Sequence, residues 1–410
     1  MRITKILSLS VIAAVLTLGS FNGPVNASEK QGEASVYAEG TAAEIGKQYG
    51  EQAKWAIAQN IDLFKVAAQA ADFTKEDLES TAADYQAFLL EESPELLEQY
   101  KAMAEGSGVE LEDLLAFNVL EEQVVGDGCT TIIATGSATQ GDKAYYHKNR
   151  DASRGYKQVV LQIVPEDGNK FLGITSAGSS GIAMGINEHG VSVGNNVLHT
   201  WDRGSGYGNL TVIRMALENA ENAQEAVSYI QDLPRSSGSV YGIADKEEGA
   251  FLETTHSAYA VKWVVDEAMA HTNHYILPEM EQYEALDDDP AERERWSWYI
   301  STEERLERAT DLLNEKTGKL NPQDLVKISE DQDGEEPVYW IDAQYELNGR
   351  GMGSVSTGTF DGSKLRMWSQ LGQPSVAPAI PFEVDRPHIP EPFSSGAQSD
   401  RLVNTAENRE

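Results

Sequence analysis

The stretch Asp127-Gly128-Cys129-Thr130-Thr131 contains the only cysteine of this 410-residue chain and marks its sharpest change of pattern. From residue 41 to about residue 121, apolar side chains such as Ile45 and Tyr49 recur at steps of three and four, which indicates amphipathic helices. From residue 130 onward, short runs rich in β-branched and aromatic residues are separated by Gly, Asn and Asp, which indicates strands joined by turns. Cys129 therefore stands where a helical region ends and a strand-rich region begins.

Two groups of predicted strands follow, with helices between them. The first group covers residues 130–135, 144–147, 158–164, 171–175, 182–186 and 191–193, with Asn187-Glu188-His189-Gly190 as a hairpin connection. Residues 210–220 and 223–233 return to helical spacing, and the second group covers residues 240–244, 251–254, 260–265 and 268–272. Strands in groups, rather than in strict alternation with helices, predict an α+β fold in which stacked antiparallel sheets are covered by helices.

Three further patterns complete the prediction. Pro94 fits the first turn of a helix that Ser93 caps. Residues 291–313 form a charged amphipathic pattern that predicts another helix, and residues 355–360 with 365–369 predict a final hairpin. The segment 385–410 is rich in Pro, Ser and charge, so we expect a flexible acidic tail.

The first residues have the pattern of a signal peptide. Arg2 and Lys5 give a basic start, residues 6–21 are mostly apolar, and Val25-Asn26-Ala27 resembles a cleavage site of small residues. A membrane anchor is the alternative, but the apolar run is a little short for a bilayer span. We therefore expect residues 1–27 to be removed and the mature protein to be secreted or extracytoplasmic.

The charge of the chain limits its partners. Acidic residues outnumber basic residues by 66 to 32, which gives a formal net charge of -34. A field of this sign repels phosphate backbones and anionic lipid, so we expect no nucleic-acid partner and, once the signal peptide is gone, no membrane partner. A single cysteine also excludes an internal disulfide, so the apolar core has to hold the fold.

Cys129 is either a small buried apolar residue or a reactive thiol. A thiol that follows a glycine can attack the preceding carbonyl, because glycine has no side chain in the way and allows unusual backbone angles. Water then resolves the thioester, and Cys129 becomes the first residue of a new chain. Its α-amino group titrates near neutral pH, at about 7.7, so the same residue supplies both the nucleophile and the base.

Several motifs in order resemble one enzyme family. They are Gly128-Cys129-Thr130-Thr131-Ile132-Ile133-Ala134, Tyr146-His147-Lys148-Asn149-Arg150-Asp151, the stretch from Gly185 to Asn196, and Ala270-His271-Thr272-Asn273-His274. With these motifs the chain resembles the acyl-coenzyme-A:6-aminopenicillanic-acid acyltransferase family, whose members mature by cleavage at Gly-Cys. The resemblance extends from about residue 41 to about residue 374, and it implies a four-layer αββα N-terminal-nucleophile hydrolase core with a helical N-terminal segment.

The resemblance also implies site residues. Cys129 corresponds to the nucleophile, Asp151 to the carboxylate near the new amine, and Asn273 to a donor of the oxyanion hole; Gly128 and Cys129 flank the expected cut. Taken alone, Asp151 can be a turn residue and Asn273 can cap a strand end. Lys148, Arg150 and Asn195 are the expected substrate-binding residues. The family's penicillin branch has a tryptophan where Arg150 stands, and related bile-salt hydrolases have an arginine where Lys148 stands. A cation here can bind a substrate carboxylate, lower the thiol pKa, or pair with surplus acid.

No cofactor or metal is expected. His271 and His274 suggest a pair of metal ligands, but no further His or Cys cluster completes a tetrahedral set, so we interpret both as structural. The serine that the acyltransferase branch carries late in the chain has no secure match, although Ser354 and Ser356 lie nearby.

These observations predict a division of the chain and a function. The division is 1–27 signal peptide, 28–128 helical pro-segment, 129–384 catalytic chain and 385–410 tail. The predicted function is that of an exported, autoproteolytic cysteine amidohydrolase that cleaves a small linear non-peptide amide. Its partners are that small molecule and its own cleaved N-terminal fragment. Acyl transfer to a small amine and an uncleaved binding protein are the alternatives; an ordinary serine hydrolase has no Gly-x-Ser-x-Gly motif to support it.

Overall fold

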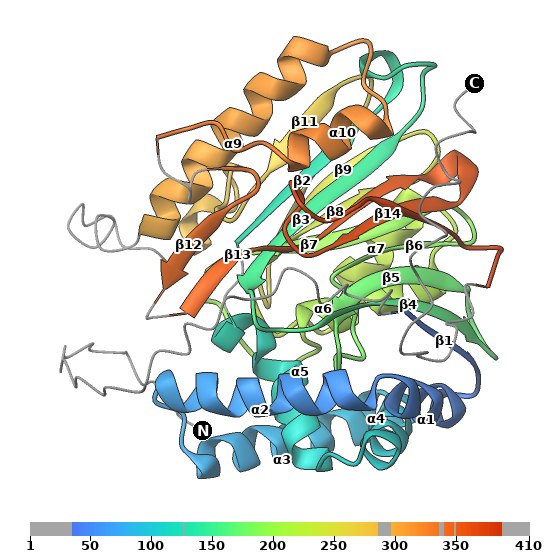
Figure 1. Cartoon of the computed structure of the whole chain (residues 1–410), viewed down its shortest axis with the longest axis vertical. Coiled ribbons are helices and arrows are strands. Elements are labelled where there is room, and N and C mark those ends of the chain that lie inside the picture. The colour runs from blue at the N-terminus through green and yellow to red at the C-terminus, as the bar shows by residue number, and fades with distance from the viewer. Residues whose placement is uncertain (1–34, 126–127, 286–296, 336–339, 348–349, 388–410) are drawn as a thin grey trace. The chain divides into compact units, whose positions relative to one another are not determined.

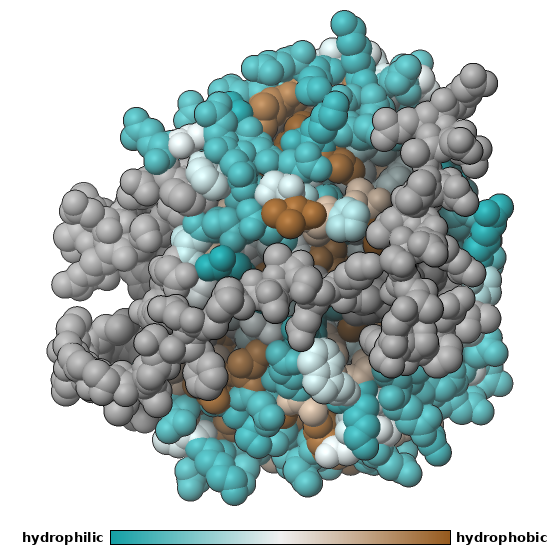
Figure 2. Space-filling view, in the orientation of Figure 1, coloured by the Kyte–Doolittle hydropathy of each residue, from teal (hydrophilic) through white to brown (hydrophobic). Residues whose placement is uncertain are grey.

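Figure 1 shows the computed structural model, which describes residues 35–125, 128–285, 297–335, 340–347 and 350–387. The expected signal peptide, residues 1–27, lies outside these ranges, and so does the greater part of the expected tail, residues 385–410. Every described helix is too short or too polar to span a bilayer. Figure 2 shows hydrophilic residues over much of the described part of the face in view.

The larger sheet has eight strands among the described residues. In spatial order they are β1 (Ser35–Gly40), β4 (Gln158–Pro165), β5 (Phe171–Ser176), β6 (Met184–Asn187), β7 (Ser192–Val197), β8 (Ser239–Ala244), β9 (Gly249–Thr254) and β10 (Tyr259–Val264). β1 runs parallel to β4, and the other neighbouring pairs are antiparallel. The predicted hairpin joins β6 to β7, and Gly190 takes a φ of 88° there, which favours glycine.

The smaller sheet contains the motif around Cys129. Its order is β11 (Ala268–His271), β2 (Gly128–Ala134), β3 (Tyr145–Ser153), β13 (Arg350–Asp361), β14 (Arg366–Leu371) and β15 (Ile380–Glu383), with β12 (Gln344–Leu347) also paired to β13. All these pairs are antiparallel. The predicted final hairpin is confirmed as β13 and β14.

Successive side chains of β2 point to opposite faces of the smaller sheet, and their contacts show how the two sheets are layered. Ile133 belongs to a core cluster with Leu172 and Met184 of the larger sheet, so its face of β2 packs against that sheet. Ile132 points the other way and packs with Leu313 and other apolar residues of α9 (Ser297–Lys316) and α10 (Pro322–Ser329). The predicted helix at 291–313 is thus observed from residue 297, and residues 291–296 lie outside the described ranges.

Helices also cover the far face of the larger sheet. α6 (Asn209–Asn219) and α7 (Ala223–Asp232) contribute Leu217 and Ile230 to a third cluster, which includes Val193 and Ile243 of that sheet. The layers are therefore helix, sheet, sheet and helix, which confirms the predicted α+β fold of four-layer αββα type. Short 3-10 helices lie at Gly136–Ala138, Glu281–Tyr283 and Gly362–Lys364.

The N-terminal segment is helical, as predicted, but it also adds a strand. Its helices, drawn in blue to blue-green in Figure 1, are α1 (Ala42–Gln52), α2 (Lys54–Ala70), α3 (Lys75–Glu92), α4 (Pro94–Ser107) and α5 (Leu111–Val125). Pro94 occupies the first turn of α4, as expected; Ser93 stands at the N-cap position, but its side chain makes no capping hydrogen bond. Residues 35–40, for which no element was predicted, form β1 at the edge of the larger sheet.

Candidate active site

Cys129 lies in β2 of the smaller sheet, between β11 and β3, and only 1% of it is exposed. In the β2–β3 register Cys129 is opposite Arg150, and Gly128 is opposite Asp151. Because side chains alternate along a strand, the Cys129 and Arg150 side chains share the face that packs on the larger sheet. Asp151 lies on the other face, toward α9. The side chain and the main-chain nitrogen of Cys129 are therefore surrounded by different sets of residues.

Asn273 holds the main-chain nitrogen of Cys129. The Cys129 N–H donates to Asn273 Oδ1 at 2.8 Å, although the two residues are 144 positions apart. Asn273 Nδ2 donates to the carbonyl of Val197 at 3.1 Å, and the Asn273 N–H donates to Thr302 Oγ1 of α9 at 2.6 Å. The amide is fixed from three sides, with its oxygen toward Cys129 and its nitrogen toward the end of β7.

Asp151 lies beside the bond that the sequence analysis expects to be cut. Its Oδ1 accepts a hydrogen bond from Ser354 Oγ at 2.6 Å, whereas its Oδ2 is buried with no hydrogen-bond partner among the described residues. A Cβ atom placed on Gly128 would lie 3.0 Å from Asp151 Oδ2, so glycine is the residue that allows this approach. Burial raises the Asp151 pKa to about 6, against the opposing effects of Arg305 and Ser354. The uncut chain thus leaves a carboxylate oxygen without a donor next to Gly128.

The raised Asp151 pKa predicts how the stability of the uncut chain depends on pH. In the folded chain the Asp151 pKa is about 6, above the ordinary carboxyl pKa of 3.8. The proton bound to Asp151 therefore stabilises the fold fully below pH 3.8, and this stabilisation is lost as the pH rises through 6. The free energy of unfolding is measured in urea for Cys129→Ala and for the control Cys129→Ala/Asp151→Asn, which has no carboxyl at position 151. From pH 4.5 to pH 7.5 the chain with Asp151 should lose on the order of 2 kcal/mol relative to the Asn control, at about 1.4 kcal/mol per pKa unit. Equal changes in both chains would contradict the buried-acid assignment.

Arg305 of α9, which no sequence pattern predicted, links the residues around Cys129. Its Nη1 donates to the Cys129 carbonyl at 2.6 Å and to Thr130 Oγ1 at 3.0 Å, and its Nη2 donates to Asn273 Oδ1 at 3.0 Å. Nη1 is also 4.0 Å from Asp151 Oδ2. Arg305 is 2% exposed, which is rare for an arginine without a specific role. With two donors on its oxygen, the Asn273 amide has its orientation fixed by hydrogen bonding and not by packing alone.

The turn that carries Asn273 follows β11 of the smaller sheet and is held by residues of the larger sheet. His271 Nε2 lies 2.8 Å from Glu253 Oε1 of β9, and the same carboxylate accepts the Ile276 N–H at 2.8 Å. Asn196 Nδ2 of β7 donates to the carbonyls of His271 and Thr272, each at 2.9 Å. His271 is thus placed as a structural residue of this turn.

Buried His147 and partly buried His274 each lie next to a threonine hydroxyl, and His147 Nδ1 is 2.8 Å from Thr359 Oγ1. His274 Nδ1 lies 3.1 Å from Thr302 Oγ1, and burial, helped by the charges of His271 and Arg305, lowers its pKa to about 4. Burial likewise lowers the His147 pKa to about 3. Both rings are therefore neutral near pH 7. No group of three or more His, Cys, Asp or Glu residues in the described part of the chain is arranged to hold a metal ion.

The three expected substrate-binding residues are buried on the inner side of the smaller sheet or next to it. Arg150 Nη2 donates to Glu121 Oε1 at 2.8 Å, so this cation is paired with an acid of α5. Lys148 Nζ donates to the Asn195 carbonyl and, at 3.4 Å, to that of Ala183. Asn195 Nδ2 donates to Glu122 Oε1 at 2.8 Å. Lys148 and Arg150 share the face of Cys129, and no contact above joins them to Asp151 or Asn273.

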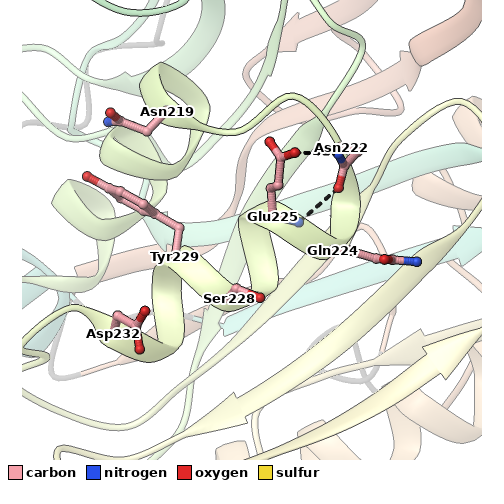
Figure 3. A pocket seen from close by; sticks show the side chains of 7 residues that line it. All are labelled: Asn219, Asn222, Gln224, Glu225, Ser228, Tyr229 and Asp232. Carbon is pink, nitrogen blue, oxygen red and sulfur yellow. Dashed lines mark hydrogen bonds between the residues drawn. The ribbon is translucent and has the colours of Figure 1, made fainter.

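Two hollows in the described surface lie away from this cluster. The first, of about 550 Å³, is shown in Figure 3; the second, of about 410 Å³, lies where α9 and α10 meet. The first is lined by Asn219, Asn222, Gln224, Glu225, Ser228, Tyr229 and Asp232. In Figure 3 the polar side chains of Asn222 and Glu225 bond to each other across the start of α7. Neither hollow includes a residue that contacts Cys129, so neither bears on the chemistry of the thiol.

Solved structures and a curated protein resemble this chain. A Caenorhabditis elegans N-acylethanolamine-hydrolyzing acid amidase ortholog gives a TM-score of 0.39 at 19% identity, covering 57% of this chain and 93% of its own. Penicillin V acylase from Agrobacterium tumefaciens gives 0.36 at 12% identity, covering 59% and 83%. The acyl-coenzyme A:6-aminopenicillanic-acid-acyltransferase 40 kDa form of Emericella nidulans is 26% identical over 282 residues, which are 65% of this chain and 77% of that protein.

A match to a family model identifies the family. A family model described as acyl-coenzyme A:6-aminopenicillanic acid acyl-transferase matches residues 138–376, which is more than half of the chain and includes Asp151, Asn273 and Arg305. The matched span begins shortly after Cys129. The chain therefore belongs to the acyl-coenzyme A:6-aminopenicillanic acid acyl-transferase family and is an amide hydrolase or acyltransferase of the N-terminal-nucleophile type.

Proposed function

We propose that this protein is an exported amidohydrolase that cuts its own chain between Gly128 and Cys129 and then uses Cys129 to cleave a small linear amide. One observation carries the proposal: the Cys129 nitrogen is held by Asn273 Oδ1 at 2.8 Å, and next to the preceding residue, Gly128, lies a buried Asp151 oxygen that has no hydrogen-bond donor among the described residues. If the Cys129 nitrogen becomes an amine, the Asp151 oxygen can serve as its second hydrogen-bond acceptor, beside Asn273 Oδ1. An ordinary strand cysteine needs no such surroundings.

The cut needs only the chain itself and one water molecule. Cys129 Sγ attacks the Gly128 carbonyl carbon, the C–N bond breaks, and the thiol proton ends on the Cys129 nitrogen. Water then hydrolyses the thioester, which leaves a carboxylate on Gly128 and a free thiol and amine on Cys129. Asp151 Oδ2 lies on the Gly128 side of this bond and can accept a hydrogen bond from the new ammonium.

Turnover reuses the same atoms. The Cys129 amine takes the thiol proton, the thiolate attacks the substrate carbonyl, and Asn273 Nδ2 together with a backbone N–H donates to the oxyanion. The amine then protonates the leaving nitrogen, and water clears the acyl-enzyme. The N-terminal fragment stays attached during turnover, because β1 pairs along the whole of its length with β4 and α5 belongs to the main core cluster.

Hydrolysis is preferred over transfer because of the expected export, since acyl-coenzyme A is not available outside the cytoplasm. The curated relative from Emericella nidulans is named for acyl transfer to 6-aminopenicillanic acid, a reaction that forms an amide, and this supports amides as the substrate class. The buried position of Arg150 and its pairing with Glu121 do not favour a substrate carboxylate at that cation. We therefore propose a neutral acyl group on a small amine.

A panel of acylated amines tests this function. Purified protein and the Cys129→Ala variant are incubated with acyl chains of graded length on ethanolamine, on amino acids and on 6-aminopenicillanic acid, and the released amine is measured. Release by the wild type alone supports hydrolysis. Adding an acceptor amine and finding a new amide in place of free acid would favour transfer instead. No reaction, with binding retained and a single chain on a denaturing gel, would identify a binding protein.

Catalysis should not depend on a histidine as the general base. Burial lowers the His274 pKa to about 4. Both ring nitrogens of His271 are occupied, Nε2 by Glu253 Oε1 at 2.8 Å and Nδ1 by the Thr272 carbonyl at 3.1 Å, so neither is directed at the Cys129 thiol. His271→Gln and His274→Gln should each keep processing and at least about a tenth of the wild-type kcat. The assay uses cut, folded protein. Complete loss of acylation in one variant, with normal processing, would indicate a Cys-His pair.

A further inference from the structure

The last turns of α5 carry two neighbouring carboxylates that reach residues beyond the expected cut. Glu121 Oε1 pairs with Arg150 Nη2 at 2.8 Å, and the two side chains are 2% and 1% exposed. Arg150 also donates to Ser176 Oγ of β5 at 3.1 Å. This ion pair therefore joins the N-terminal segment to both sheets.

Glu122 makes the second attachment. Its Oε1 accepts from Asn195 Nδ2 of β7 and its Oε2 from Asn209 Nδ2 of α6, each at 2.8 Å. Burial raises the Glu122 pKa, opposed first by the hydrogen bond from Asn195. All three partners of these two acids, Arg150, Asn195 and Asn209, come after Cys129 in the chain.

The position of the ion pair matters more than its energy. A buried ion pair is weak evidence for stability, because the cost of removing both charges from water offsets their attraction. Here Glu121 Oε2 is buried and has no hydrogen bond among the described residues, which adds to that cost. The hydrogen bond within the pair has a defined direction, however, so it restrains where the two side chains lie. Arg150 stands directly opposite Cys129 in the β2–β3 register. The pair therefore fixes the end of α5, eight residues before Cys129, relative to the strand that faces the thiol.

We propose that the Glu121–Arg150 ion pair is a positioning device for self-processing, which presents the Gly128 carbonyl to the Cys129 thiol. The inference rests on the proposed function and assigns Arg150 to the handling of the precursor and not to substrate binding. Attack requires the sulfur and the carbonyl carbon about 3 to 3.5 Å apart, and a misplacement of about 1 Å can cost a hundredfold in rate. A directional pair next to the reacting strand supplies that restraint.

The test separates position from stability. In Glu121→Leu/Arg150→Met both charges are replaced by apolar side chains of similar volume, a change that buried ion pairs commonly tolerate. Arg214→Met/Glu218→Leu is the matched control: it removes another ion pair, of 2.9 Å with side chains 7% and 19% exposed, that lies wholly after the cut. Processing is followed on denaturing gels after synthesis of labelled precursor, and stability by urea unfolding of each variant in a Cys129→Ala background.

The expected result is a Glu121→Leu/Arg150→Met chain that folds about as stably as the control and processes at least tenfold more slowly. Processing at the control rate would overturn the proposal. If this variant does not fold, Glu121→Gln/Arg150→Gln keeps a neutral polar pair in the same place and should also process more slowly; failure of both to fold would show that the pair serves stability, which also overturns it. If the wild-type chain itself is never cut, the proposed function is refuted, and this outcome is distinguishable from a wild type that is cut normally while the variant processes at the control rate.

Discussion

Cys129→Ala is expected to abolish both processing and turnover, the largest effect that this account predicts. Without sulfur, nothing attacks the Gly128 carbonyl, so the mature chain stays in one piece and no amine with a thiol beside it is formed. The measurement is a denaturing gel of the purified variant, together with amine release from the best substrate of the panel. Cys129→Ser, which keeps a weaker nucleophile at the same place, should cleave slowly.

The fold of Cys129→Ala should survive the change. Cys129 is 1% exposed, and the lost sulfur leaves only a small gap beside strand β3. Its circular dichroism spectrum should match that of the wild type, which makes it the reference for every processing assay. Two chains from this variant, cut at the same bond, would show that an outside protease and not Cys129 makes the cut.

Asn273→Ala should lower kcat by about a hundredfold to a thousandfold, because one donor to the oxyanion is lost. Asn273→Asp is the informative companion. It keeps an oxygen that can accept from the Cys129 N–H and from Arg305, the contacts made by Asn273 Oδ1 at 2.8 and 3.0 Å, but it replaces the Nδ2 donor by an acceptor. Both variants are assayed as cut, folded protein.

The two substitutions separate donation from positioning. If Asn273 stabilises the oxyanion through Nδ2, the Asp variant should be as impaired as the Ala variant. If Asn273 serves only to hold the Cys129 nitrogen, the Asp variant should retain most of the wild-type kcat. A loss below about threefold in Asn273→Ala would mean that the oxyanion hole is elsewhere.

Local patterns predicted most of the strands because each strand is marked within a few residues. The change of pattern at Cys129 coincides with the end of α5 at Val125 and the start of β2 at Gly128. β1 was missed because its six residues pair with β4, more than a hundred positions away, and no local pattern records that pairing. α10 was missed too, although Asn321 caps it and Pro322 opens it, because eight residues give little periodicity.

The motifs predicted the residues around the Cys129 nitrogen better than those that hold them. Asp151 and Asn273 were named from motifs, and the structure brings both to that nitrogen or to the glycine before it. Arg305 could not be found this way, because it stands among other charged residues of an amphipathic helix and only tertiary packing turns it inward. The pairing of Arg150 with Glu121 could not be predicted for the same reason, because it depends on where α5 lies against β3 and no local pattern records that.

The intact mass of the purified wild-type protein, with sequencing of each chain's first residues, shows whether Cys129 becomes the first residue of a new chain. We expect two chains that separate only on denaturation, the larger of them beginning with Cys129. We also expect that a reagent specific for α-amines at an N-terminal cysteine labels that chain and abolishes turnover. A single uncut chain that hydrolyses amides at full rate would rule out the N-terminal-nucleophile mechanism, because Cys129 would then act without the amine that its cleavage supplies.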